Sequence, residues 1–215
     1  MKNFISSYRS FFIRERFRSL LVGILLLSLA VISQNFASSY AMANSGQFVG
    51  DFFLEVLPII NLNNIIIEGA FIAFLLTIIL IFQKPNYIIF TMKASALFIT
   101  TRAFMISVTH LGIYPGQITS GFGFSDRIYE ALNLHAGYFF SGHTGFPLLM
   151  ALIFWKKRVL RYLFLTISAV FGISVLLAHV HYSIDVFAAP FMTYSIFKLA
   201  EYLFPEDYAL VDAAD

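Results

Sequence analysis

The chain has 215 residues, of which 59% are hydrophobic, 18% aromatic and only 12% charged, and its formal net charge is +2. Soluble domains usually contain about 45–50% apolar and about 25% charged residues, so this composition excludes a water-soluble globular fold. Cysteine is absent, which excludes disulfides, thiolate chemistry and zinc–sulfur sites. The composition therefore indicates an integral membrane protein.

Six apolar stretches are close to the length of roughly twenty helical residues that crosses the hydrocarbon core of a bilayer. In chain order they are residues 20–41, 65–82, 87–111, 138–155, 159–178 and 183–204. No internal repeat or shift in composition marks a second domain. We predict an all-α membrane protein, a bundle of six transmembrane helices over residues 20–204, with a basic arm (1–19) before it and an acidic tail (205–215) after it.

Basic residues predict the orientation of this bundle. Five lie in residues 2–18, one is Lys84 between the second and third spans, and four lie between or just inside the fourth and fifth spans: Lys156, Lys157, Arg158 and Arg161. Segment 43–64 has no Lys or Arg, and segment 112–137 has only Arg127. Because positive loops stay in the cytoplasm, both termini are predicted to be cytoplasmic. This distribution reflects topology and gives no indication of nucleic-acid binding.

The first span has a second interpretation. A basic start, a short apolar run and Ala-Met-Ala at 41–43 also fit a cleavable signal peptide. The apolar stretch, however, continues through Ser33, Gln34 and Asn35, which would suit a helix packed inside a bundle. We favour an uncleaved span, and the orientation of the later spans is the same in both cases.

The first external loop carries two acidic residues, Asp51 and Glu55. They could attract a cationic headgroup such as ethanolamine or choline. The alternative is that both are solvated loop charges.

The third predicted span carries two basic residues at membrane depth. Arg102 lies roughly two and a half turns before the external end at His110. No acid on this span is placed to pair with it, so its expected partner is a substrate phosphate or Asp185. The alternative is an arginine that snorkels or pairs with another span. Lys93 lies toward the inner half and receives no role.

The fourth span begins with the sequence FFSGHTGF at residues 139–146. Ser141 is a good N-cap, Gly142 permits close backbone approach, and His143 then falls in the first helical turn. The fourth and sixth spans both run inward, so both present helix N-termini at the external face. Helix N-termini favour anions, and two of them bearing histidines predict a phosphate site.

The sixth span begins within HVHYSIDVF, residues 179–187. His181 and Asp185 are four residues apart and share one helical face. The carboxylate can accept the imidazole N–H and leave the other ring nitrogen free for nucleophilic or acid–base chemistry. We interpret His179 as a turn residue or an outer-rim contact, and His110 and His135 as interfacial residues.

A metal site is the competing chemistry for this cluster. Zinc needs three or four convergent ligands, which His143, His181 and Asp185 could supply. Spacing alone leaves this alternative open. Arg102 and the helix N-termini favour an anion instead, so we expect no metal and no other cofactor.

The residues SGHT at 141–144 and HYSID at 181–185 resemble the second and third motifs of the type 2 phosphatidic acid phosphatase superfamily. The longer segments HVHYSIDVFAAPF and TRAFMISVTHLGIYPG are more similar to the sphingomyelin synthase branch, and the resemblance covers roughly residues 50–200. It implies six transmembrane helices, a catalytic side facing away from the cytoplasm and no metal. It also implies that His181 forms a phosphohistidine, Asp185 orients it and His143 protonates the leaving oxygen.

The chain departs from both branches of the superfamily. The classical first motif is absent, and Val175 stands where the classical third motif has an arginine. Residues 135–137 read His-Ala-Gly, where the synthases carry Cys-Gly-Asp. The resemblance therefore implies the catalytic residues but not the headgroup.

These observations predict a membrane lipid phosphatase or phosphotransferase. Its substrate would be a phospholipid or lipid phosphate, with water or a lipid alcohol such as ceramide or diacylglycerol as acceptor. Arg102, Ser141 and Gly142 would bind the phosphate. There are two alternatives: a transporter, and a non-catalytic lipid-binding scaffold that retains the fold. A transporter needs ionisable residues spread along a path through the membrane, whereas the ionisable residues of this chain cluster near one face.

Overall fold

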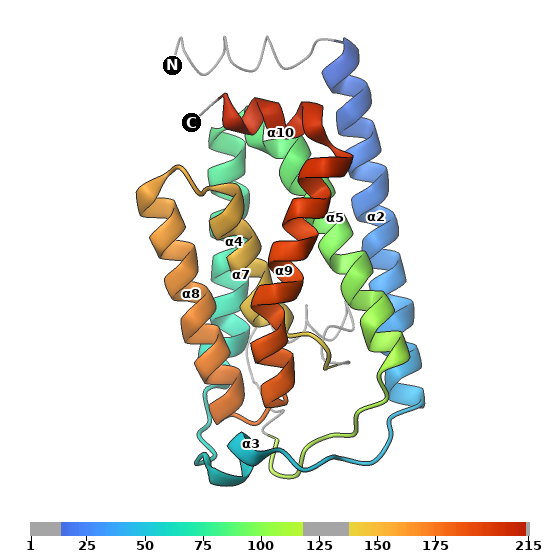
Figure 1. The fold of residues 1–215 in the computed structure, drawn as a ribbon, viewed down its shortest axis with the longest axis vertical. Coiled ribbons are helices and arrows are strands. Elements are labelled where there is room, and N and C mark those ends of the chain that lie inside the picture. Colours follow the sequence, from blue (N-terminus) through green and yellow to red (C-terminus); the bar gives the residue numbers. More distant parts are fainter. Residues whose placement is uncertain (1–13, 118–137, 214–215) are drawn as a thin grey trace.

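The computed structural model describes residues 14–117 and 138–213 (Figure 1). Its elements in chain order are α2 (Arg14–Ala43), α3 (Phe52–Val56), the π-helical segment η1 (Asn64–Glu68), α4 (Gly69–Gln83), α5 (Pro85–Val108), α7 (Gly142–Ile153), α8 (Arg158–Leu177), α9 (Ser183–Leu203) and α10 (Pro205–Asp212). Neither described range contains a β-strand. The predicted all-α class is confirmed.

Each predicted span overlaps one or two helical elements of the structure. Residues 20–41 lie in α2, 65–82 in η1 and α4, and most of 87–111 in α5, while the last three spans correspond to α7, α8 and α9. Four of these helical segments, within α2, η1–α4, α5 and α8, are long and apolar enough to cross a membrane. Helix α7 is a shorter apolar helix of 12 residues. The chain is thus an integral membrane protein, whereas the count of six spans stays a prediction.

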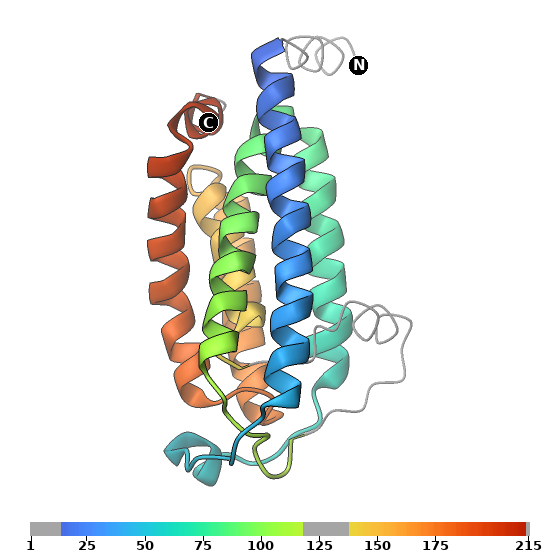
Figure 2. The same ribbon diagram turned by 90° about the vertical axis from the view of Figure 1, so that its right-hand side faces the viewer.

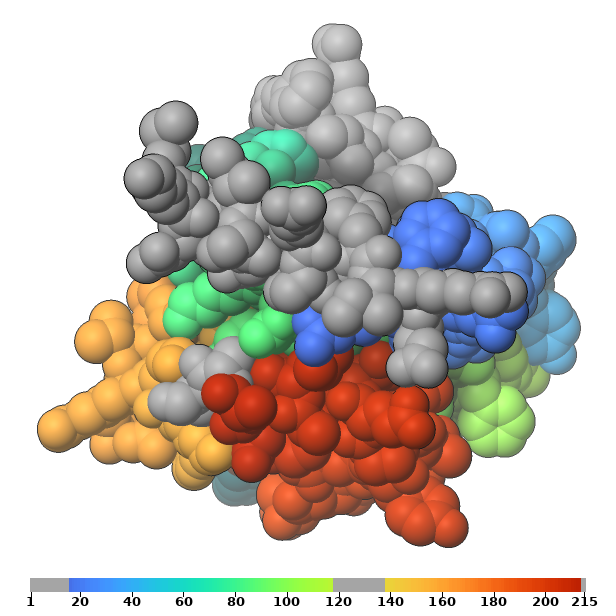
Figure 3. All heavy atoms as spheres, turned by 90° about the horizontal axis from the view of Figure 1, so that it is seen from above, coloured from blue at the N-terminus to red at the C-terminus, as the bar shows by residue number. Residues whose placement is uncertain are grey.

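The long helices lie side by side along the long axis of the molecule (Figures 1 and 2). The start of α2, the α4–α5 junction, the α7–α8 junction and α10 gather at one end, and α3 lies at the other. Figure 3 looks onto the first end, where the red C-terminal helix is seen beside the blue start of α2. The basic residues Lys84 and Lys156 belong to junctions at this end. The positive-inside rule requires basic loops to lie at the same end of the bundle, as these do. Which side of the membrane this end faces stays a prediction.

The main core lies where α5, α7 and α9 meet. Phe98 of α5, Leu149 of α7 and Ala189 of α9 are among its fully buried residues. Gly145 makes this packing possible, because a Cβ atom there would lie 2.8 Å from Thr193 Oγ1 and 2.9 Å from the Phe98 ring. Outside the core, large apolar side chains are exposed on all the long helices except α7, including Leu25, Ile72, Phe104, Val170 and Phe191. A lipid-facing surface needs such side chains.

Helix α10 packs against the end of the bundle. From the sequence we predicted only an acidic tail over residues 205–215. The Lys93 Nζ atom lies 2.6 Å from Asp207 Oδ2 and donates a 2.7 Å hydrogen bond to Ser19 Oγ. Ser19 Oγ donates to Asp207 Oδ1 at 2.8 Å. The Lys93 and Asp207 side chains are only 8% and 9% exposed. Lys93, which had no predicted role, therefore ties α10 to α5 and α2.

Candidate active site

The turn between α8 and α9 places the first catalytic candidate. The amide of Val180 donates to Val175 O at 2.9 Å, and that of His179 donates to Leu176 O at 3.0 Å. His179 has a φ of 54°, so it takes the left-handed position that ends a helix in a Schellman motif. His179 is a turn residue, one of its two predicted positions. It is 3% exposed rather than at the outer rim, and the turn delivers His181 to the start of α9.

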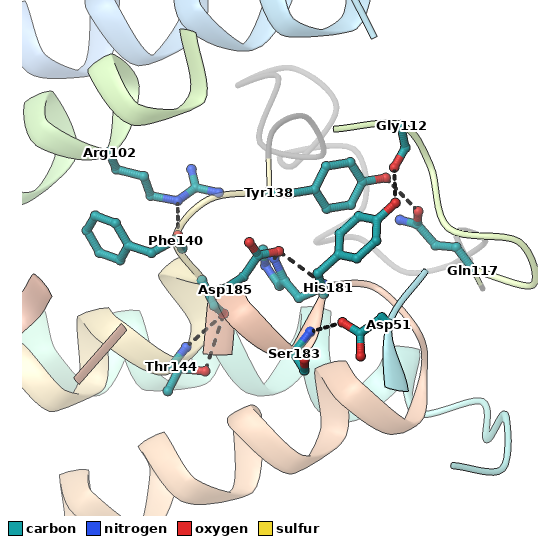
Figure 4. A network of polar contacts seen from close by, with 12 residues as sticks. Asp51, Arg102, Gly112, Gln117, Tyr138, Phe140, Thr144, His181, Ser183 and Asp185 are labelled. Atoms are coloured by element: carbon teal, nitrogen blue, oxygen red, sulfur yellow. Dashed lines mark hydrogen bonds and ion pairs between the residues drawn. The ribbon is translucent and has the colours of Figure 1, made fainter. Parts of the chain in front are cut away.

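His181 and Asp185 form a buried pair across the first turn of α9 (Figure 4). The His181 Nδ1 atom lies 3.2 Å from Asp185 Oδ2, which also accepts a 3.0 Å hydrogen bond from the Tyr182 amide. The other oxygen, Asp185 Oδ1, is buried without a hydrogen-bond partner among the described residues. A proton held on Nδ1 by the carboxylate leaves Nε2 with its lone pair available, which is the arrangement a nucleophile needs.

The first turn of α7 carries His143 and is held by both neighbouring helices. Ser141 is the predicted N-cap, and its hydroxyl accepts from the Thr144 amide at 3.3 Å. The Ser141 amide donates to Asp185 O at 3.0 Å, and Ser168 of α8 donates to Thr144 O at 2.7 Å. The rings of His143 and His181 are 5.9 Å apart between centroids. The His143 ring, in the first turn of α7, therefore lies close to the His181 ring, in the turn just before α9.

Arg102 of α5 lies at the same helix N-terminus. Its Nε atom donates to Phe140 O at 3.0 Å (Figure 4). A Cβ atom on Gly142 would lie 3.3 Å from this Nε atom, so the missing side chain of Gly142 makes room for the guanidinium. The structure thus brings Arg102, Ser141 and Gly142 together beside His143. This combination of a cation and a helix N-terminus can bind an anion.

The N-terminus of α9 has internal partners. Asp51 Oδ2 accepts a 2.7 Å hydrogen bond from the Ser183 amide, and Asp51 Oδ1 caps α3 through the amides of Phe53 and Leu54. Asp51 is buried, while Glu55 is exposed. Two helix N-termini were predicted to bind an anion. At the N-terminus of α9, backbone N–H groups already donate to carboxylates of the protein itself, those of Asp51 and Asp185. A headgroup role for Asp51 and Glu55 stays a prediction.

Two tyrosines beside His181 were missed by the sequence analysis. The Tyr138 ring lies 6.2 Å from the His181 ring, and its hydroxyl donates to Gln117 Oε1 at 2.9 Å. The Tyr182 hydroxyl donates to Gly112 O at 2.8 Å and accepts from the Val49 amide at 3.3 Å. These bonds hold the connections after α2 and α5 next to His181 (Figure 4). The only sequence signal was the position of Tyr182 directly after a candidate nucleophile.

The remaining ionisable candidates have simpler surroundings. His110 is exposed and its ring packs 5.6 Å from that of Tyr40, as an interfacial residue would. His135 lies outside the described residues. Within the described ranges, no three His, Asp or Glu side chains converge as a set of metal ligands. That the protein needs no metal remains a prediction.

Comparison with protein families gives a match over part of the chain. Residues 136–202 match the family model "PAP2 superfamily C-terminal". Comparisons with curated proteins and with solved structures found no significant match. The matched segment contains α7, α8 and nearly all of α9, and with them Ser141, His143, His181 and Asp185. This match does not distinguish the synthase branch from the phosphatases, and for this segment of the chain it supports the type 2 phosphatidic acid phosphatase (PAP2) superfamily.

Proposed function

We propose that this protein is a lipid phosphatase or phosphotransferase that works through a phosphohistidine on His181. The observation that carries this proposal is one arrangement of three side chains. His181 Nδ1 lies 3.2 Å from a buried carboxylate oxygen of Asp185, and the centroid of the His143 ring, on α7, lies 5.9 Å from that of the His181 ring. A nucleophile with an orienting carboxylate and a separate proton carrier is what stepwise phosphoryl transfer requires.

In the first step, Nε2 of His181 attacks the phosphorus atom of the lipid phosphate. The N–P bond forms as the P–O bond to the lipid alcohol breaks. Protonated His143 gives its proton to the departing alkoxide, so the alcohol leaves neutral. Asp185 accepts the Nδ1 proton in a hydrogen bond and stabilises the positive charge that develops on the His181 ring.

In the second step, neutral His143 takes a proton from the acceptor. With water as acceptor, the new P–O bond forms as the N–P bond breaks, and inorganic phosphate leaves with both histidines restored. With a lipid alcohol as acceptor, the same step transfers the phosphoryl or phospho-headgroup. The match to the PAP2 superfamily supports hydrolysis. The resemblance of residues 101–116 and 179–191 to the synthase branch implies transfer.

Phosphate binding is assigned to Arg102 and the first turn of α7. The oxygens on phosphorus gain negative charge in the transition state, and fixed donors stabilise it without reorganising. Gly142 has no side chain to separate the guanidinium from the helix N-terminus, which supports this role. Ser141 contributes by fixing the helix start.

A substrate panel tests the proposal. The purified protein in nanodiscs is incubated with radiolabelled phosphatidic acid, phosphatidylcholine and phosphatidylethanolamine, each with and without ceramide or diacylglycerol. We expect phosphate or headgroup release, or a labelled product lipid, that is lost in His181→Ala. Substrate movement across the bilayer without any chemical product would instead favour the transporter, and tight lipid binding alone would favour the scaffold.

A further inference from the structure

Asp51 lies in the first external connection, yet it accepts a hydrogen bond from the first residue of α9, the helix that carries Asp185 and begins two residues after His181. Its Oδ2 atom accepts from the Ser183 amide at 2.7 Å, across 132 positions of sequence. Its Oδ1 atom accepts from the amides of Phe53 at 3.0 Å and Leu54 at 3.2 Å. Asp51 is 8% exposed. Both carboxylate oxygens are therefore engaged with backbone donors, and the short helix α3 fixes the carboxylate against the start of α9 (Figure 4).

The start of α9 needs an acceptor that its own N-cap residue does not supply. The first N–H groups of a helix have no partner within it, and Ser, Thr, Asp or Asn at the N-cap usually provides one. Here the N-cap residue is Tyr182, whose hydroxyl is directed to Gly112 and Val49. Asp185 accepts from the Tyr182 amide. Asp51 thus supplies the acceptor for the Ser183 amide from outside the helix.

The bond from Ser183 to Asp51 also affects the Asp185 carboxylate. Its Oδ2 atom accepts a hydrogen bond from the Tyr182 amide and lies within hydrogen-bond distance of His181 Nδ1. If Asp51 did not accept from Ser183, that amide would compete for the same nearby carboxylate or leave the first turn frayed. Either change would weaken the bond to His181. We propose that Asp51 is a positioning residue: by capping α9 from the external loop, it reserves the Asp185 carboxylate for His181.

The electrostatics of the turn agree with this placement. Burial raises the pKa of the Tyr182 hydroxyl, while its bond from the Val49 amide lowers it. The negative charges of Asp185 and Asp51 both raise that pKa further. The cap stands on geometry alone, and its catalytic consequence rests on the proposed function.

The cap itself is tested without any activity. Hydrogen exchange in nanodiscs is followed by mass spectrometry for wild type, Asp51→Asn and Glu206→Gln, the last a matched change at the exposed first turn of α10. Asp51→Asn should speed exchange at least tenfold in peptides covering residues 180–187 and leave the interior of α9 unchanged. Glu206→Gln should leave both segments at wild-type rates. Wild-type exchange at the start of α9 in Asp51→Asn would overturn the inference.

The catalytic consequence is tested by a double-mutant cycle with Asp185→Asn. Asp51→Asn should lower kcat about ten- to a hundredfold, as small misplacements of catalytic groups do, with KM within about twofold of wild type. In the Asp185→Asn background the same change should cost less than about threefold, since the carboxylate that Asp51 serves is already gone. Additive losses would show a merely structural role and overturn the inference. If wild type turned over no lipid, the proposed function would fail, while the exchange experiment would still decide the cap.

Discussion

At the scale of single residues, His143 and His181 have different surroundings, so replacing each of them should cause a different loss of activity. His181 pairs with Asp185 at 3.2 Å, whereas His143 lies across from it on α7, partly exposed. A proton carrier matters most when the leaving group is poor. His143→Ala should lose nearly all turnover of natural lipid esters but keep a burst of p-nitrophenol from a p-nitrophenyl phosphoester. His181→Ala should lose both, and equal loss in the two variants would contradict the assignment.

Arg102 should act through the shape of its guanidinium as well as its charge. Its Nε atom is bonded to Phe140 O at 3.0 Å, which orients the planar group beside the start of α7. Lysine keeps the charge but lacks this fork. Arg102→Lys should lower kcat/KM about a hundredfold, as the loss of one transition-state donor does, with an unchanged melting temperature. The exposed Arg158→Lys serves as control, and activity within twofold of wild type in Arg102→Lys would remove Arg102 from the site.

The sequence predicted those contacts of the site that join residues close together in the chain. The i, i+4 spacing of His181 and Asp185 and the N-cap preference of Ser141 are properties of a few neighbouring positions, and the structure shows both. Asp51 was different, because its bond to Ser183 spans 132 positions. No sequence pattern that spans a few neighbouring positions can predict a hydrogen bond between residues so far apart. The sequence could therefore identify Asp51 as a charged residue near the site but not its partner.

At the scale of elements, the α10 contact makes a stability prediction. Lys93 and Asp207 are buried and paired at 2.6 Å, so Asp207→Asn leaves a buried lysine without its counter-charge. Breaking such a pair costs about 3–5 kcal/mol. Asp207→Asn should unfold at clearly lower temperature or denaturant concentration than wild type, measured by circular dichroism in detergent. The exposed neighbour Glu206→Gln should match wild type.

A double variant tests the physical reason for this loss. Replacing both partners with apolar residues, Lys93→Met together with Asp207→Leu, removes the buried charges and should recover most of the stability. If Asp207→Asn were as stable as Glu206→Gln, α10 would not be held by this pair.

The long helices were predictable because each one is encoded by its own apolar stretch. The span predicted at 183–204 corresponds to α9 (Ser183–Leu203) in the structure. The span predicted at 159–178 corresponds to α8 (Arg158–Leu177). Helix α10 was not predicted, because residues 205–215 are acidic and not apolar. Its Asp207 pairs with Lys93, 114 positions away in the sequence. Length and hydropathy locate helices, but they do not specify which polar residues meet between them.

At the scale of the whole molecule, the basic junctions and α10 lie at one end and α3 lies at the other (Figure 1). The positive-inside rule predicts that the first end is cytoplasmic. Since the chain has no cysteine, single cysteines can report the two sides. Phe52→Cys, at a residue that is 73% exposed on α3, should react with an impermeant maleimide in intact cells. Lys157→Cys should react only after permeabilisation, and the reverse pattern would invert the topology.

The central claim is that His181 carries the phosphoryl group, and trapping that group tests it most directly. Wild type is mixed with ³²P-labelled phosphatidic acid, quenched in alkaline denaturant to preserve phosphohistidine, and its labelled peptides are sequenced by mass spectrometry. We expect acid-labile phosphate on His181, present in wild type and absent from His181→Ala. Phosphate found on His143, or label that persists in His181→Ala, would contradict it.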